Sequence, residues 1–312
     1  MTSPLLARPG AVAADPPDEG VAAHYGDPYR EQRQLVEGLA SVDLSHRPVV
    51  RVTGPDRLTW LHSLTSQDLE HLAVSDATEA LLLSPHGHVE HAMSLVDDGE
   101  STWLHVEPGT AEELVRFLDS MRFWSKVEVE DLTSTHALVL RPDAVPGAVS
   151  RRVPEGVESF VRREGLSDHL AGELAGILAL EALRVAAGRP RFGLETDHRT
   201  IPHEVGWIPS AVHLDKGCYR GQETVARVQN LGRPPRRLVL LHLDGSDSVL
   251  PATGEPVVLD GRDVGRVTSS ARHYELGPIA LAVVKRSTPA DADLVVGVAG
   301  GVAASQEVLV PA

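Results

Sequence analysis

The chain has 312 residues, of which 42% are hydrophobic, and its formal net charge at pH 7 is −15. This length exceeds that of a usual single hydrophobic core, so we expect two or three domains. The acidic balance argues against direct binding to nucleic acid, which depends on clustered Lys and Arg. The longest apolar runs are too short to cross a bilayer and no signal-like segment opens the chain, so we expect a cytoplasmic protein without a membrane partner.

The first half of the chain mixes helical and strand-like patterns. Residues 1–25 are rich in Ala, Pro, Asp and Gly without periodicity, which predicts a disordered tail. Leucines repeat on one face of a predicted helix at 55–64, and a second helix is predicted at 110–123. Strand-like segments occur at 80–83, 89–96, 102–106, 126–130 and 136–140. This order predicts an α+β region over residues 26–150.

The second half changes from helical to all-β patterning. A middle region, 151–233, contains a predicted helix at 172–187 that Gly188 ends. The basic, Pro-containing stretch 233–237 is interpreted as an interdomain linker whose arginines could touch an anionic ligand. Short strands alternating with turns then predict a β-barrel over residues 237–312. The expected strands are 238–243, 256–259, 263–267, 279–284, 293–298 and 307–310.

One run of eight residues concentrates chemically distinctive side chains, and we call it the octet: Lys216-Gly217-Cys218-Tyr219-Arg220-Gly221-Gln222-Glu223. A thiol acts as a nucleophile or metal ligand only as the thiolate, which nearby cations or a helix N-terminus favour. Lys216 and Arg220 share a face with Cys218 if the segment is extended, and a helix starting near Gly221 would add partial positive charge. This setting favours a reactive Cys218 over the alternative of a small buried hydrophobe.

Cys218 is the only cysteine in the chain. This excludes an internal disulfide framework. It also excludes an iron–sulfur cluster held by this chain alone, because such clusters normally take several Cys ligands. In the helix that follows the octet, Glu223 is expected to pair with Arg227 at i,i+4.

Two histidine-containing segments are candidate metal sites. In a strand, His86, His88 and Glu90 would share one face and His91 would point to the other. Without a second ligand cluster at a familiar spacing, a structural or pocket-lining role is favoured over metal binding. The pair at 203–204 lacks the H-E-x-x-H spacing of a zinc protease, so no metal site is predicted.

The octet, continuing through Arg227, resembles the signature of the YgfZ family. These proteins are folate-binding relatives of the glycine-cleavage T-protein, implicated in assembling or repairing iron–sulfur enzymes. The resemblance covers about residues 25–310 and implies an α+β, T-protein-like fold with α+β N-terminal and middle domains and a C-terminal β-barrel. The other segments that carry it are 43–46, 52–56, 64–68, 183–190, 201–204 and 265–270.

The resemblance also implies a ligand and roles for individual residues. Tetrahydrofolate or a derivative would lie in a central pocket, with Glu204 at the position of the T-protein carboxylate that hydrogen-bonds the pterin. Trp207 is a candidate stacking residue, and Arg227 would hold Glu223 or an anionic ligand group. Cys218 would act as nucleophile or as a transient metal or sulfur ligand. From local sequence alone, Glu204 could equally be a solvated loop acid and Trp207 a packing residue.

The chain departs from the T-protein pattern at one position that matters for chemistry. Residues 87–91 resemble a Gly-Gly-x-x-Asp-Asp-like turn, but Glu90-His91 replace the Asp pair, so aminomethyl transfer is not expected. The predicted function is support of 4Fe-4S enzyme assembly or repair, with iron–sulfur client or assembly proteins as partners and any effect on tRNA modification indirect. The alternatives are a folate-dependent one-carbon transferase or demethylase and a noncatalytic protein-docking module.

Overall fold

The computed structural model describes residues 1–170, 172–208, 210–245, 249–297 and 301–310. The chain forms two compact units, each assembled from separate segments. The first unit contains residues 1–82, 91–180 and 215–219, and the second contains residues 83–90, 181–214 and 220–312. The domain ranges expected from the sequence, 26–150 and 151–233, remain predictions.

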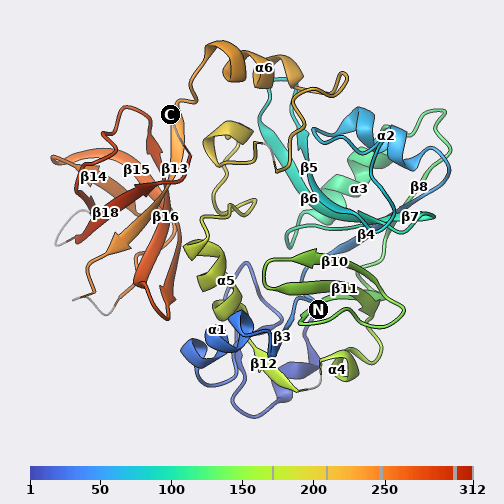
Figure 1. Ribbon diagram of the computed structural model, residues 1–312, viewed down its shortest axis with the longest axis horizontal. Helices are drawn as coiled ribbons and strands as arrows, with labels where there is room; N and C mark the ends of the chain where they lie inside the picture. Colours follow the sequence, from blue (N-terminus) through green and yellow to red (C-terminus); the bar gives the residue numbers. More distant parts are fainter. Residues whose placement is uncertain (171, 209, 246–248, 298–300, 311–312) are drawn as a thin grey trace. The chain divides into compact units, whose positions relative to one another are not determined.

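A five-stranded sheet covered by two helices forms one part of the first unit (Figure 1). Helices α2 (Arg57–Leu64) and α3 (Ala111–Ser120) bury Leu61, Leu114 and Leu118 in one cluster with Val52 and Leu104 of the sheet. The leucine spacing produces this packing, because residues three and four apart lie on the same helix face. The sheet order is β5 (Ala77–Leu83), β6 (Val89–Asp97), β7 (Ser101–His105), β4 (Val49–Thr53) and β8 (Glu128–Asp131).

A second five-stranded sheet completes the first unit. Its short strand β12 pairs in parallel with β3, whereas β10, β11, β9 and β3 pair antiparallel. Residues 173–175, which the sequence placed in a helix, form β12 because they pair with β3. The order is β10 (Val149–Val153), β11 (Gly156–Arg162), β9 (His136–Arg141), β3 (Ala40–Asp43) and β12 (Glu173–Ala175); α1 (Pro28–Val36) and α4 (Leu166–His169) belong to the same unit.

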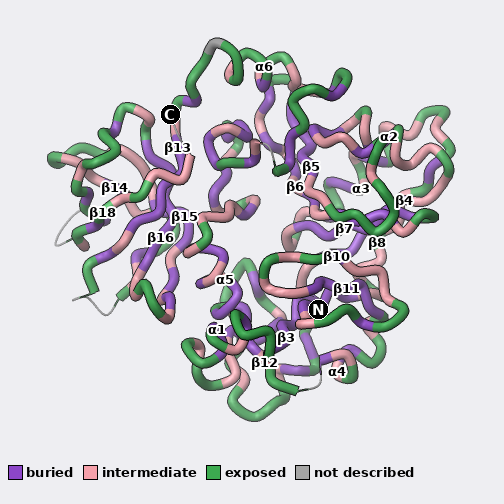
Figure 2. Tube along the Cα trace, in the orientation of Figure 1, coloured by how far each residue is buried: buried purple, intermediate pink, exposed green. Residues whose placement is uncertain are grey.

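The expected disordered tail is instead folded. Residues 1–25 contain the 3-10 helix η1 (Pro4–Ala7) and the paired strands β1 (Val12–Ala13) and β2 (Ala22–His24). Leu5 is buried with Val139 and Leu166 of the second sheet and α4, and Val21, Ala22 and Ala23 are buried as well, so apolar burial accompanies the order of a segment without periodicity. Figure 2 shows buried stretches within this segment.

The second unit contains the closed six-stranded barrel, which confirms the C-terminal β-barrel expected from the sequence. Alternate inward residues such as Val239, Leu241, Ala280 and Ala282 form its core. Residue 298, at the end of one expected strand, lies outside the described residues. The strands, in order around the barrel, are β13 (Arg236–Leu243), β16 (Gly277–Lys285), β15 (Arg262–His273), β14 (Pro256–Leu259), β17 (Leu294–Val296) and β18 (Val302–Val308).

Three further helical segments position the site. Helix α5 spans Ile177–Ala186 and ends before Gly188, as expected. The 3-10 helix η2 (Pro202–Glu204) and helix α6 (Gln222–Leu231) belong to the second unit. Over the described ranges, no helix is long and apolar enough to span a membrane.

Candidate functional site

The second half of the octet packs against the turn that joins β5 to β6. Helix α6 begins directly after Gly221, as the sequence indicated. Gly221 has a φ of +83°, and an added Cβ would lie 2.5 Å from the Ser84 carbonyl oxygen. At Gly87 an added Cβ would lie 2.7 Å from the Thr224 Cβ. Only glycine permits approaches this close, so the contact depends on the glycines at positions 87 and 221.

An ion pair joins the same two segments. The Arg220 Nη1 donates to Glu90 Oε2 at 2.8 Å, and the two side chains are 35% and 38% exposed. Arg220 therefore offsets part of the charge of the Glu90 carboxylate. The neighbouring His91 points to the other side of β6, as predicted, and its burial lowers the pKa of the ring, which favours the neutral form.

Histidines 86 and 88 do not form a metal centre with their neighbours. Their ring centroids lie 6.3 Å apart. Among the residues that the structure describes, no group of three or more His, Cys, Asp or Glu could hold a metal ion.

The side chain of Lys216 points into the first unit, so the arrangement expected for the octet is wrong at this residue. Its Nζ donates to the carbonyl oxygens of Thr65 at 2.6 Å and Gln67 at 2.8 Å and also to that of His62. It lies 5.2 Å from the centroid of the Tyr219 ring. Burial lowers the pKa of Lys216 to about 8, and burial raises the pKa of Tyr219 to about 12.

Cys218 is exposed, whereas Lys216 and Tyr219 are buried. Lys216 and Cys218 therefore do not share a face, because residues 216–219 do not form the extended strand on which that expectation depended. Gly217 is also exposed. The thiol at Cys218 is thus accessible to reagents in solution, as a reactive role requires.

The expected ion pair between Glu223 and Arg227 is not formed. Both side chains lie on the exposed face of α6, and neither has an ion-pair partner within the described part of the chain. An exposed pair of this kind gains little free energy over separate hydration, which accounts for the difference. Arg227 is therefore available to another anion.

Glu204 is a buried member of a charged cluster that includes Arg236 and Asp197. Its oxygens accept from Arg236 Nε at 2.9 Å and Nη2 at 2.8 Å, and from the Ile201 N–H at 3.2 Å. Its side chain is 1% exposed, which excludes the solvated loop acid considered from the sequence. Arg236 lies in β13, so the stretch predicted as a linker contributes a strand residue to this cluster.

Asp197 is the second acceptor of Arg236. Arg236 Nη1 donates to Asp197 Oδ2 at 2.5 Å and Nη2 to Oδ1 at 3.2 Å. Burial alone would raise the pKa of Asp197, but the hydrogen bonds from Arg236 hold that pKa well below its usual range. The sequence singled out Glu204 and the arginines at 233–237 separately, but not their contact, because the partners of Arg236 lie more than 30 residues away in the chain.

Trp207 is 5% exposed, so the described structure agrees with a packing role.

The residues of the octet have different surroundings. Lys216 and Tyr219 face the interior of the first unit, Arg220 and Gly221 contact the β5–β6 turn, and Cys218 is exposed. Gln222 and Glu223 open α6.

Comparisons with known proteins point to one group. Residues 236–311 match a family model described as the glycine cleavage T-protein C-terminal barrel domain. A putative chloroplastic transferase of Arabidopsis thaliana is 26% identical over 84% of this chain and 70% of its own length. An aminomethyltransferase of Herpetosiphon aurantiacus is also 26% identical, over 91% of this chain and 90% of its own.

A solved structure agrees over almost the whole chain. The glycine cleavage system aminomethyltransferase T from Bartonella henselae superposes with a TM-score of 0.82 at 19% identity, covering 98% of this chain and 95% of that one. The expected T-protein-like fold is thereby confirmed.

Proposed function

We propose that this glycine-cleavage T-protein-like protein binds a tetrahydrofolate derivative and assists the assembly or repair of 4Fe-4S enzymes, as the YgfZ-like octet implies. The observation that carries the proposal is the ion pair between Arg220 and Glu90. It joins the octet to the turn that resembles the acidic turn of T-proteins. The two features that set this sequence apart from that pattern are therefore in direct contact.

The ion pair argues against aminomethyl transfer as the main activity. A carboxylate that assists such a transfer has to be free to interact with the reacting group. Here the guanidinium of Arg220 occupies an oxygen of Glu90, and the adjacent His91 is buried and favours its neutral form. Neither side chain supplies the free carboxylate that the Asp pair would offer.

Folate binding is proposed from the resemblance and from the relatives named aminomethyltransferase. A carboxylate suits the donor edge of an aminopterin ring, because two N–H groups can meet two oxygens. The Glu204 carboxylate fits this role if Arg236 moves away from it while keeping Asp197 as its acceptor. When bound, a reduced folate supplies a carrier for one-carbon units.

Of the two remaining candidate residues, we assign Arg227 to ligand binding and Trp207 to packing. Arg227 is exposed and has no ion-pair partner among the described residues, so its guanidinium can bind an anionic group of the ligand. Trp207 is buried, and we assign it to packing next to η2, where its backbone N–H donates to the Pro202 carbonyl oxygen at 3.2 Å.

Cys218→Ala is expected to reduce support of iron–sulfur enzyme activity to the level of the empty vector in a strain that lacks the native gene. The reason is that the variant removes the only thiol of the chain, and that thiol is accessible. The measurement is the specific activity of a 4Fe-4S enzyme in extracts with matched amounts of each variant.

Leu214→Ala, at a nearby exposed position, is the control and is expected to give full support. Full support by Cys218→Ala at an equal protein level would remove the thiol from the mechanism.

A second candidate function is a folate-dependent one-carbon transferase or demethylase, which the names of the relatives favour. It predicts formation of methylene-tetrahydrofolate or formaldehyde from an amine substrate, independently of Cys218. A noncatalytic docking module predicts instead that Cys218 and Glu204 are both dispensable. Testing variants of Cys218 and of Glu204 for both activities therefore distinguishes the three functions.

A further inference from the structure

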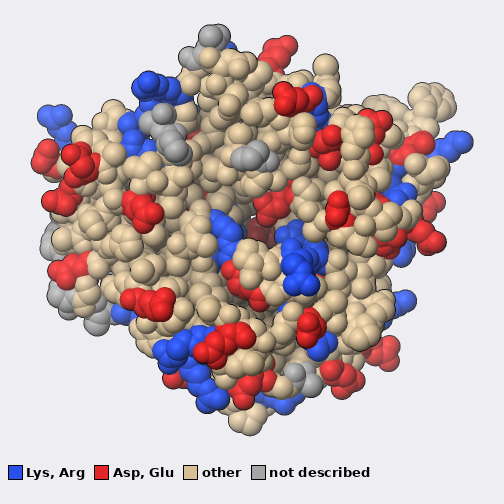
Figure 3. Space-filling model, in the orientation of Figure 1, with Lys and Arg blue, Asp and Glu red and all other residues tan. Residues whose placement is uncertain are grey.

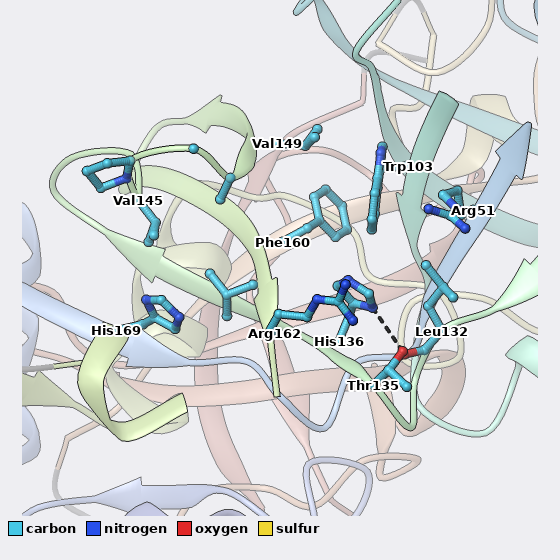
Figure 4. A pocket seen from close by; sticks show the side chains of 14 residues that line it. Arg51, Trp103, Leu132, Thr135, His136, Val145, Val149, Phe160, Arg162 and His169 are labelled. Atoms are coloured by element: carbon cyan, nitrogen blue, oxygen red, sulfur yellow. Dashed lines mark hydrogen bonds between the residues drawn. The ribbon is translucent and has the colours of Figure 1, made fainter. Parts of the chain in front are cut away.

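The first unit contains a cavity of about 510 Å³ that shares no residue with the octet or with the Glu204 cluster. Its walls come from β4 and β7 of one sheet, from β9, β10 and β11 of the other, from the end of α4 and from the loops around them (Figure 4). This volume lies within the range of small-molecule sites. The lining residues are Arg51, Trp103, Leu132, Thr135, His136, Val145, Pro146, Gly147, Ala148, Val149, Phe160, Val161, Arg162 and His169.

One side of the cavity is aromatic and held in place. The rings of Trp103 and Phe160 have centroids 5.7 Å apart and are tilted by 42°, and His136 meets the Trp103 ring at 5.3 Å. Trp103 Nε1 donates to Asp98 Oδ2 at 2.9 Å, which fixes the indole. Trp103 and Phe160 are 8% and 4% exposed, so only a small part of each ring, fixed by its packing, borders the cavity.

The polar groups of the cavity are cationic or neutral. None of the lining residues is acidic, although the whole chain carries a net charge of −15. The guanidinium carbon of Arg51 lies 5.4 Å from the Trp103 ring centroid, and Arg51 donates to Glu130 of β8, outside the lining, at 2.6 Å. Arg162 is exposed and forms no ion pair with any residue that the structure describes.

The state of His136 reflects these surroundings. Burial, followed by the charges of Arg162 and Arg51, lowers the pKa of its ring, which is therefore mainly neutral at pH 7. Its Nδ1 lies 3.0 Å from the Thr135 Oγ1. Figure 4 shows His136 and Arg162 close together below the two aromatic rings.

We infer that this cavity binds a small aromatic carboxylate, whose ring packs on Trp103 and Phe160 and whose carboxylate lies between Arg51 and Arg162. The guanidinium of Arg162 suits a carboxylate, whereas Arg51, which is bound to Glu130, adds positive charge nearby. The parts of Trp103 and Phe160 that border the cavity suit a flat ring. A free inorganic anion would leave the aromatic surface unused, and a neutral ring would leave Arg162 without an anion. The aromatic side and the arginines of the cavity therefore both favour an aromatic carboxylate.

The test is calorimetric titration of the full chain with benzoate, benzamide and inorganic phosphate. Benzoate is expected to bind saturably with a Kd of about 1 mM or below, and benzamide and phosphate about tenfold more weakly. Arg162→Gln is expected to weaken benzoate binding about fivefold, because it removes a charge-assisted contact. Arg152→Gln removes an exposed arginine of β10 outside the cavity and is expected to leave the affinity unchanged.

The ring of His136 supplies an independent readout. A bound carboxylate between the two arginines offsets their charge, so benzoate is expected to raise the pH midpoint of the His136 signals in nuclear magnetic resonance spectra. The proposal is overturned if benzoate does not saturate, if phosphate binds as tightly as benzoate, or if Arg162→Gln and Arg152→Gln have the same affinity. A His136 midpoint that benzoate leaves unchanged would place the ligand elsewhere and also overturn it.

Discussion

Replacing Arg236 with methionine is expected to lower the free energy of unfolding by about 3–5 kcal/mol, the cost of leaving a buried charge without its partner. The Glu204 carboxylate is 1% exposed and, among the described residues, would keep only the Ile201 N–H as donor, while Asp197 would lose both of its contacts with the guanidinium. The measurement is equilibrium unfolding in urea. Arg227→Met is the control, because Arg227 is an exposed arginine without an ion-pair partner in the described structure, and we expect a change within about 0.5 kcal/mol.

The double variant Arg236→Met with Glu204→Met separates the ion pair from simple loss of packing. Removing both charges leaves no buried carboxylate at position 204, so part of the lost stability should return. Equal stability of Arg236→Met and Arg227→Met would mean that the cluster does not hold η2 and β13 together.

Gly221→Ala is expected to lower the free energy of unfolding by about 2–4 kcal/mol and to loosen the contact between α6 and the β5–β6 turn. A left-handed backbone costs a residue with a Cβ about 1 kcal/mol, and here the Cβ also meets a carbonyl oxygen. That oxygen belongs to Ser84 and lies 2.5 Å from the position of the added atom. Thermal and urea unfolding measure the loss.

Gly261→Ala is the matched control for this change. Gly261 has a φ of +75°, but an added Cβ has no neighbour within 4 Å, so only the backbone cost applies. We therefore expect Gly221→Ala to be the more damaging of the two. Equal losses would show that the turn moves aside without cost and that the close approach is not required.

Elements with a clear period could be predicted from the sequence. The spacing of Leu114 and Leu118 in α3 and the short alternating strands of the barrel each express burial on one face, and that pattern is visible without coordinates. The start of α6 after Gly221 was also predictable, because glycine and the following residues mark a helix boundary. The N-terminal segment was not, since its buried residues, such as Leu5, pack against residues far away in the sequence.

The site was predictable in its members but not in their partners. The octet identified Cys218 and Arg220, yet Arg220 pairs with Glu90, 130 residues earlier in the chain. The burial of the Lys216 side chain could not be predicted for the same reason. Its acceptors are backbone carbonyls about 150 residues away, and no residue pattern marks them. Spacing predicts faces of regular elements, and residues 216–219 are not part of one.

Charge alone would not have located either proposed site. Figure 3 shows acidic and basic side chains interspersed over the face in view, with no extended basic surface. The clusters around Arg236 and Arg162 are defined by individual distances and by what surrounds each guanidinium. The prediction that nucleic acid is not a direct partner therefore continues to rest on the net charge of −15.

Calorimetric titration with tetrahydrofolate under anaerobic conditions tests the central claim most directly, using the wild type, Glu204→Gln and the exposed-helix control Glu223→Gln. Glu204→Gln keeps the shape of the side chain and an acceptor for Arg236, but replaces one carboxylate oxygen with a donor. We expect saturable binding to the wild type and to Glu223→Gln, and at least about tenfold weaker binding to Glu204→Gln. Absence of binding to the folded wild type would contradict a folate-linked function, and unchanged affinity of Glu204→Gln would contradict the position assigned to the pterin.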